Sequence, residues 1–233
     1  MITVRRYSPE YRDGVRRVCI ETAYFGEHLN KWLDIHPDLF ADFFTRYYTD
    51  FEPEGLQVAL NGNILVGYMA LCSNLERQKR IMKQVIVPDI MLKIITGRYS
   101  LGRKVFVVAL RMITDHLRYG PLNLEPAGYN ADIHINFLPD YIAQYRVWGE
   151  MVINGYDYLI KRGVRYIKGV LLQRWENPED KMNLLGFKPL QIRETTIVNG
   201  SKAQFLITGC DLWEWREKLP RAIRIFTRRD KMK

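Results

Sequence analysis

Three polar residues alternate with apolar ones along the segment ADIHINFL, residues 131–138. The spacing predicts a β-strand over 133–138, and successive side chains of a strand point to opposite faces. Asp132, His134 and Asn136 therefore share one face. A histidine has the intrinsic pKa of a general base near neutral pH, so His134, with Asp132, could take a proton from a substrate. A buried, hydrogen-bonded histidine or a solvated polar face would explain the same pattern.

A sharp turn follows this strand, and a helix is predicted after it, over 147–162. The unpaired amides and positive dipole end of a helix start can hold phosphate groups. Such sites usually contain glycine, because the backbone must approach the ligand closely. The turn PDYIAQYRVWG, residues 139–149, has one glycine, yet Arg146 could contact a phosphate directly. The turn is thus either a usable phosphate site or only a connection.

Other residue types that support catalysis are scattered along the chain. Glu52 and Glu54 could hold a cationic amine or act as a base through water, although an exposed loop pair is the expected outcome. His28 and His36 could line an acceptor site, although loop residues of this kind are usually solvated. No Cys and His spacing predicts a metal site, and no glycine-rich lysine loop predicts an NTPase.

The composition indicates a folded protein with an excess of positive charge. The chain has 233 residues, 47% of them apolar, a net charge of +9 and a pI of about 9.4. This balance permits an anionic partner: a nucleic acid, an acidic lipid or a phosphorylated cofactor. No run of about 18 uncharged apolar residues predicts a membrane span. Three separated cysteines and a charged N-terminus predict a cytoplasmic protein.

The remaining pattern predicts one α+β domain over residues 1–233, with a mixed central sheet flanked by helices. Asn61-Gly62-Asn63, between two apolar runs, is typical of a hairpin with a type I′ turn. Residues 75–119 predict a helical insertion, with a strand over 105–110 as the alternative. The other expected elements are helices over 8–24 and after Pro37, strands over 56–60, 64–72 and 166–172, a short helix over 178–185, a hairpin turning at Asn199-Gly200, and a basic helix over 213–228.

The predicted C-terminal helix is amphipathic and basic. Its apolar stripe comprises Trp215, Leu219, Ile223 and Phe226. Such a helix could dock on RNA or on an anionic membrane. Packing of the stripe on the protein's own sheet, with a solvated basic face, is the more ordinary interpretation.

The order and spacing of these segments resemble the GNAT (Gcn5-related) N-acetyltransferases over nearly the whole chain. The segments that carry the resemblance are LQVALNGNILVGYMALC, HINFLPDY, INGYDYLIKRGVRYIKGVLL and NPEDKMNLLGFKPL. The EPE…VGY pairing, HINFLP and the insertion are similar to one subgroup, the bacterial relatives of the acetyltransferase-like domain attached to O-GlcNAc hydrolases. In that subgroup a helical segment separates the third and fourth strands. The resemblance is weakest from Asn74 to Asn130.

The resemblance implies that the fourth strand splays from the fifth and that acetyl-CoA lies in the gap. The pantetheine arm would then pair with the backbone of Asn136, Phe137 and Leu138. The pyrophosphate would sit on a turn whose family motif is Gln/Arg-x-x-Gly-x-Gly/Ala. The residues that align with this motif are Gln144, Tyr145, Arg146, Val147, Trp148 and Gly149.

The match to the turn motif is partial. Gln144 and Gly149 match, whereas Val147 replaces a glycine; a β-branched residue does not easily take a positive φ. A second register, which starts at Ile142, matches poorly. Asn177 resembles the family's asparagine near the cofactor. Met182 stands where the family often has a tyrosine that protonates the departing thiolate, and methionine cannot donate that proton.

Three functions follow as hypotheses. The first is an acyl-CoA-dependent N-acyltransferase that moves an acetyl group from acetyl-CoA to an amine of a small molecule or protein. The second is a catalytically inactive GNAT-fold protein used for binding or assembly, with Tyr145 and Trp148 plugging the cofactor gap. The third, a nucleic-acid-binding protein, rests on charge alone. A homodimer is compatible with each of them.

Overall fold

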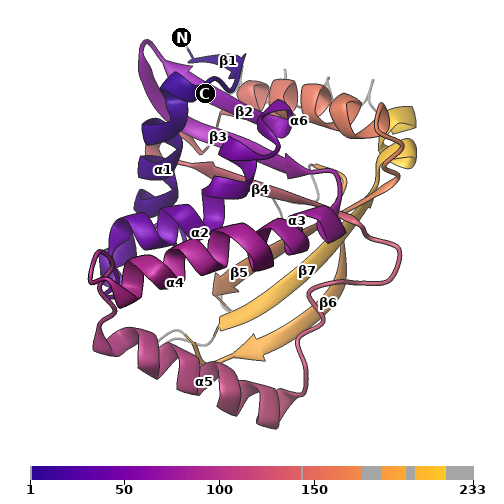
Figure 1. Ribbon diagram of the computed structural model, residues 1–233. Helices are drawn as coiled ribbons and strands as arrows, with labels where there is room; N and C mark the ends of the chain where they lie inside the picture. The colour runs from indigo at the N-terminus through magenta and orange to yellow at the C-terminus, as the bar shows by residue number, and fades with distance from the viewer. Residues whose placement is uncertain (1, 143, 175–184, 198–202, 219–233) are drawn as a thin grey trace.

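The computed structural model describes residues 2–142, 144–174, 185–197 and 203–218, which form one mixed sheet with helices on both faces (Figure 1). The strands are β1 (Ile2–Arg6), β2 (Leu56–Asn61), β3 (Ile64–Cys72), β4 (Ala131–Phe137), β5 (Tyr166–Arg174), β6 (Lys188–Thr195) and β7 (Ala203–Asp211). The helices are α1 (Arg12–Glu21), α2 (Pro37–Asp50), α3 (Leu75–Ile81), α4 (Val87–Ile95), α5 (Arg103–Tyr119) and α6 (Tyr145–Ile160).

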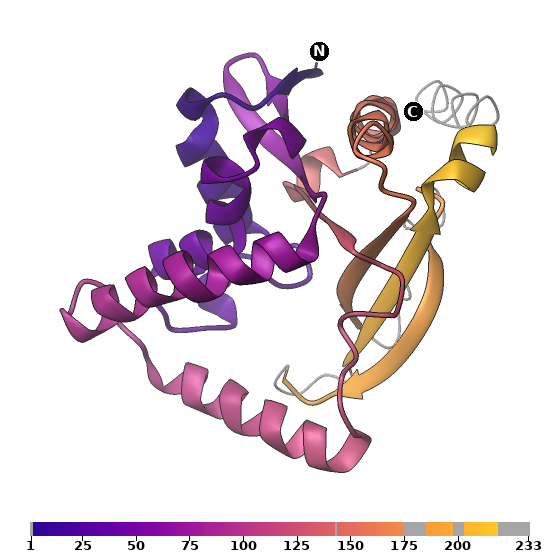
Figure 2. The same cartoon turned by 45° about the vertical axis from the view of Figure 1, so that its right-hand side comes forward.

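The strand order is β1-β2-β3-β4-β5-β7-β6. β4 and β5 run parallel, and the other neighbouring pairs run antiparallel. Helices α1 and α2 cover one face of the sheet and α6 covers the other, whereas α5 lies at the margin and contacts the sheet at the end of β6 (Figures 1 and 2). The predicted α+β class, single domain and mixed sheet are confirmed. The helical insertion between the third and fourth strands is confirmed as α3, α4 and α5.

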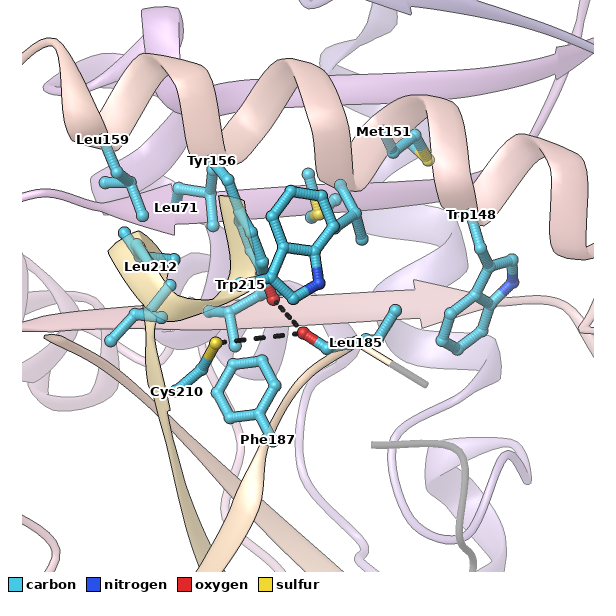
Figure 3. Close-up of a cluster of buried hydrophobic side chains, with 14 of the residues drawn as sticks. Leu71, Trp148, Met151, Tyr156, Leu159, Leu185, Phe187, Cys210, Leu212 and Trp215 are labelled. Atoms are coloured by element: carbon cyan, nitrogen blue, oxygen red, sulfur yellow. Dashed lines mark hydrogen bonds between the residues drawn. The ribbon is translucent and has the colours of Figure 1, made fainter. Parts of the chain in front are cut away.

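Strand alternation divides the core into two clusters, one on each face of the sheet. On the α6 face, Met151, Tyr156 and Leu159 point from the helix onto the sheet (Figure 3). The Tyr156 hydroxyl donates to the Leu185 carbonyl at 2.9 Å, so the one polar group on this ring is satisfied inside the apolar cluster. Trp215 is buried and meets Tyr156 edge-on at 4.7 Å between ring centroids.

The structure corrects three details of the sequence-based prediction. The hairpin loop is Gly62-Asn63, and only Gly62 takes a positive φ (+60°); the turn is therefore not type I′, which needs positive φ at both positions. The alternative strand over 105–110 is wrong, because these residues lie within α5. Strand β1 was not predicted, since five residues at the sheet edge give little periodicity.

Several predicted elements lie wholly or partly outside the described residues. They include most of the short helix over 178–185 and the turn at Asn199-Gly200. The C-terminal helix is described only over 212–218. None of the helices that the structure describes has the length and apolar character needed to cross a bilayer.

A buried carboxylate, Glu52, joins the two faces of the fold. It is 2% exposed, and its Oε2 accepts from the Tyr47 hydroxyl of α2 at 2.7 Å. Its Oε1 accepts from the Ser73 amide after β3 and from the Tyr158 hydroxyl of α6, both at 2.8 Å. The expectation that Glu52 and Glu54 form an exposed loop pair is thus wrong for Glu52, because three donors replace the water it loses. Glu54 is exposed.

We predict that Glu52→Ala destabilises the fold strongly and that Glu54→Ala does not. Removing the carboxylate leaves the buried Tyr47 hydroxyl and two partly buried donors without an acceptor, and a buried unsatisfied group costs about 1–3 kcal/mol. Chemical denaturation of both variants measures the difference. A loss below about 1 kcal/mol for Glu52→Ala, within the range of ordinary surface substitutions, would contradict the role assigned to Glu52.

Candidate active site

The pairing between β4 and β5 stops partway along both strands. Three residue pairs join them: Ala131 with Ile167, Asp132 with Lys168, and Ile133 with Gly169. Beyond this point β4 continues to pair with β3 up to Phe137, and β5 continues to pair with β7 up to Arg174. The two strands are therefore joined at one end and separate at the other. We call the separated part, residues 134–137 and 170–174, the β4–β5 split.

The polar side chains predicted to share one face of β4 do so. All three contact residues of α2 or β3 on the face that α1 and α2 cover. The Tyr48 hydroxyl donates to Asp132 Oδ1 at 3.1 Å. The Asn136 amide Nδ2 lies 2.9 Å from the Tyr68 hydroxyl and 3.2 Å from His134 Nε2. The predicted alternation thus produces a connected row of polar groups that begins at the last β4–β5 pairs and follows the split.

His134 is held as a neutral imidazole. Its ring lies among Phe44, Tyr48 and Tyr68, with ring centroids 6.0, 6.3 and 5.6 Å away. If Asn136 donates to Nε2, the proton sits on Nδ1, and the ring also bonds the backbone of Phe44. Burial lowers the pKa of His134 to about 4, because a charged imidazolium loses its hydration there. The proton-accepting form is consequently the resting form at neutral pH, but it is a weak base.

Asp132, which is partly buried, pairs with a buried lysine. Lys168, on β5, is 6% exposed, and its Nζ lies 3.9 Å from Asp132 Oδ2. Burial raises the pKa of Asp132, and the lysine charge opposes that rise. The pair spans the second of the three β4–β5 residue pairs. A charge pair therefore stands at the closed end of the split.

The turn after β4 leads directly into the start of α6. Gln144 is the residue before the helix, and the first turn closes with a hydrogen bond from the Trp148 amide to the Gln144 carbonyl, 3.1 Å long. Amides in the first turn of a helix lack acceptors within the helix, so the start of α6 provides an electropositive end beside the split. The exposed Arg146 guanidinium lies 3.5 Å from the Ile2 carbonyl of β1.

The structure changes the expected role of Val147. Its side chain is 3% exposed and packs in the core beneath α6 with Trp148 and Gly149. Its backbone is helical, and Phe25 is the one residue other than glycine with a positive φ in the described ranges. The expectation that this turn demands a positive φ is therefore wrong, since a helix start presents its amides with ordinary helical angles.

The indole of Trp148 lies beside the open part of the split. It stacks on Phe137, the last residue of β4, at 5.3 Å and 21°. A Cβ at Gly67 of β3 would clash with the Phe137 ring, so that glycine makes room for the stack. Trp148 is 9% exposed, and its Nε1 has no hydrogen-bond partner among the described residues. Tyr145 is half-buried at the helix start. Asn177 and Met182 lie outside the described residues.

Comparison with known proteins identifies the architecture. No protein-family model and no curated protein matches the sequence. SsHAT, known from a crystal structure, is 19% identical with a TM-score of 0.62, over 91% of this chain and 98% of its own. A polyamine N-acetyltransferase from Drosophila melanogaster is 10% identical, with a TM-score of 0.53 over 91% and 100%. The yncA protein of Salmonella typhimurium, described as an acetyltransferase and solved with acetyl-CoA, is 10% identical, with a TM-score of 0.51 over 91% and 94%.

The chain has the GNAT fold. The resemblance inferred from the sequence is confirmed at this level. The narrower prediction, a relation to the domains attached to O-GlcNAc hydrolases, stays a prediction, because a match at 19% identity shows the fold alone.

Sequence reasoning missed three side chains that shape the GNAT-fold site. Tyr48 and Lys168 contact Asp132 from α2 and β5, and Tyr68 contacts Asn136 from β3. A lysine within the apolar run YIKGVLL could have signalled a buried charge, because such a strand otherwise excludes one. No group of three or more His, Cys, Asp or Glu side chains in the described ranges could hold a metal ion.

We predict that His134 makes the protein less stable in acid. Its folded pKa of about 4 lies below the ordinary 6.5, so the unfolded chain takes up a proton that the folded chain refuses. The contribution of neutral His134 to the free energy of unfolding is fully present above pH 6.5 and is lost as pH falls from 6.5 towards 4. Melting temperatures of the wild type should fall more steeply over this window than those of His134→Gln.

The exposed His116 on α5 provides the control. His116→Gln should follow the wild-type curve, because an exposed side chain is solvated in both the folded and the unfolded chain. If wild type and His134→Gln lose stability in parallel between pH 6.5 and 4, His134 is not held neutral by the fold.

Proposed function

We propose that this GNAT-fold chain is an acyl-CoA-dependent N-acyltransferase, which moves an acetyl group from acetyl-CoA to an amine of a small molecule or protein. The observation that supports this most is the end of β4–β5 pairing after Ile133 and Gly169, next to the start of α6. In such a split the unpaired side of β4 can hydrogen-bond an extended ligand as another strand would. The occurrence of acetyl-CoA in the yncA structure supports the same ligand.

The cofactor would lie along the split with its phosphates towards α6. The backbone of Asn136, Phe137 and Leu138 would bind the two amides of pantetheine. Within residues 144–149, the amides of Tyr145, Arg146 and Val147 would bind the pyrophosphate, since those of Gln144 and Trp148 already donate to Tyr141 and Gln144. The Arg146 side chain would contribute a charge-assisted bond. Val147 would contact the pyrophosphate through its backbone amide, since its side chain is buried in the core. Asn177 remains a further proposed contact.

The acceptor amine would approach the thioester from the face that carries His134. Its nitrogen attacks the thioester carbon, a C–N bond forms, and the C–S bond breaks to release the CoA thiolate. His134, with Asp132, is the proposed base; the amine or a water would replace Asn136 as the donor to Nε2. Phe44, which is 39% exposed beside His134, would form part of the entrance. Water or another group would return a proton to the thiolate.

The second candidate is an inactive GNAT-fold protein used for binding or assembly. Two observations favour it: the Trp148 indole stacks beside the split, and both nitrogens of His134 have hydrogen-bond partners within the fold. On this account Asp132, His134 and Asn136 are hydrogen-bonded residues of the core with no catalytic role.

All three cysteines are unpaired and buried, as in proteins of reducing compartments. We therefore propose a cytoplasmic location for either function.

Isothermal titration with acetyl-CoA tests the proposal, and we predict that Arg146→Ala weakens the binding. Loss of a charge-assisted contact of about 1.5–3 kcal/mol reduces affinity roughly 10- to 100-fold. The matched control is Arg162→Ala, beyond the far end of α6, where the guanidinium lies over the Tyr158 ring at 3.9 Å. This control should bind like the wild type.

A truncated ligand sharpens the test. S-acetylpantetheine lacks the pyrophosphate, so it should bind wild type and Arg146→Ala equally. Wild-type protein that takes up no acetyl-CoA at millimolar concentration would refute the proposal and support the inactive alternative. If wild type and Arg146→Ala bind acetyl-CoA with the same affinity, acetyl-CoA remains the proposed ligand, but Arg146 does not contact its pyrophosphate.

A further inference from the structure

Helix α5 turns its apolar side chains outward. Phe106, Leu110, Ile113 and Leu117 are 65, 62, 59 and 79% exposed, and we call these four residues the outer stripe. A surface helix normally places such a stripe against the core. In Figures 1 and 2 the helix stands at the margin of the molecule, with this stretch connected to α4 and to the loop before β4.

The opposite side of α5 carries a buried carboxylate, Asp115, which fixes the helix to the end of β6. Asp115 is 1% exposed. It accepts from the Thr195 hydroxyl at 2.7 Å and from the Thr196 amide at 2.8 Å. The Arg193 side chain donates to the Gly120 carbonyl, just past the helix, at 2.8 Å. Because a buried carboxylate must keep these donors, the helix cannot rotate to bury its outer stripe.

The start of α5 is fixed as well. The Asp34 carboxylate accepts from the Lys104 amide at 2.8 Å, and the Asp34 carbonyl accepts from the Gly102 amide at 2.7 Å. Val105 and Val108 pack against the core on the inner side. Because both ends of α5 are fixed by hydrogen bonds, the fold itself holds the outer stripe in solvent.

The outer stripe has the spacing of a helix-pairing seam. Its residues follow one another at intervals of four, three and four, the a and d pattern of coiled coils. Around a two-fold axis, two antiparallel copies would oppose Phe106 with Leu117 and Leu110 with Ile113. A two-fold interface needs such self-complementarity.

We propose that the outer stripe is the interface through which two copies of this chain associate. Together with Val107 and Met112, which are 47 and 53% exposed, it offers several hundred Å² of apolar surface. This is on the order of the largest patch on a typical monomer, about 300–600 Å², and most of the roughly 800 Å² that each partner buries in a stable interface. On α4, Met91, Leu92 and Ile95 are 49, 59 and 77% exposed and extend the apolar surface of the insertion.

The placement of the charged residues argues against an anionic membrane as the partner of the outer stripe. A helix that lies on a membrane keeps Lys and Arg along its polar face, but that face of α5 is turned inward through Asp115. The exposed basic residues Arg103, Lys104 and Arg118 are near the helix ends. An antiparallel pair brings these ends together, so salt should strengthen the association by screening their repulsion. Salt would weaken attachment to an anionic membrane.

Sedimentation of the full-length chain tests the proposal. The wild type is expected to be a dimer at micromolar concentration, more strongly at 500 than at 50 mM NaCl. Leu110→Glu with Ile113→Glu should give a monomer with unchanged circular dichroism, because both side chains are exposed in the single chain. The control, Ile64→Glu at the start of β3, replaces a residue that is 63% exposed elsewhere and should remain dimeric.

A wild-type monomer up to submillimolar concentration would overturn the proposal, as would a dimer that Leu110→Glu with Ile113→Glu leaves intact. The same proteins should be sedimented with vesicles of phosphatidylserine and phosphatidylcholine. A wild-type monomer that binds these vesicles through Leu110 and Ile113 would assign the stripe to a membrane and also overturn the dimer.

Discussion

The incomplete pairing of β4 and β5 is the constraint on which the rest of the candidate site depends. A strand in the middle of a sheet normally pairs on both edges, because buried backbone groups need hydrogen-bond partners. Here three residue pairs join the strands, and the remainder of β4 pairs with β3 alone. The backbone groups of β4 that face the split therefore lack a partner strand, and an amide-containing ligand can hydrogen-bond to them. The same divergence places the polar row of Asp132, His134 and Asn136 beside the ligand's proposed path.

Buried carboxylates hold the surrounding elements in position. Glu52 joins α2, the end of β3 and α6 through three donors. Asp42 of α2 binds Arg16 of α1, and it accepts from Lys93 of α4 at 2.9 Å and from the Tyr99 hydroxyl at 2.7 Å. Asp115 fixes α5 to the end of β6. Each carboxylate is compensated by several donors, so losing one donor leaves a buried charge only partly satisfied. These groups orient the helices that face the split, and they also hold the outer stripe in solvent.

The sequence predicted what depends on local periodicity. Alternation alone placed Asp132, His134 and Asn136 together, and Asn-Gly located the hairpin. It did not reveal Tyr48, Lys168 or the burial of Glu52, because their partners come from elements far apart in the chain. The expectation that Val147 occupies a position suited to a positive φ was wrong. The family motif gives residue types, whereas the backbone angles follow from the helix start that the structure shows. The exposure of the outer stripe was equally invisible, because an amphipathic pattern does not say which face meets the core.

Hydrogen–deuterium exchange with and without acetyl-CoA tests most directly whether the split is a ligand site. The unpaired side of β4 should exchange faster than its β3-paired side in the free protein. Acetyl-CoA should slow exchange in peptides covering 134–138 and the first turn of α6, and should leave β1 and β2 unchanged. Protection confined to other segments, or none in 134–138 at saturating ligand, would contradict the account.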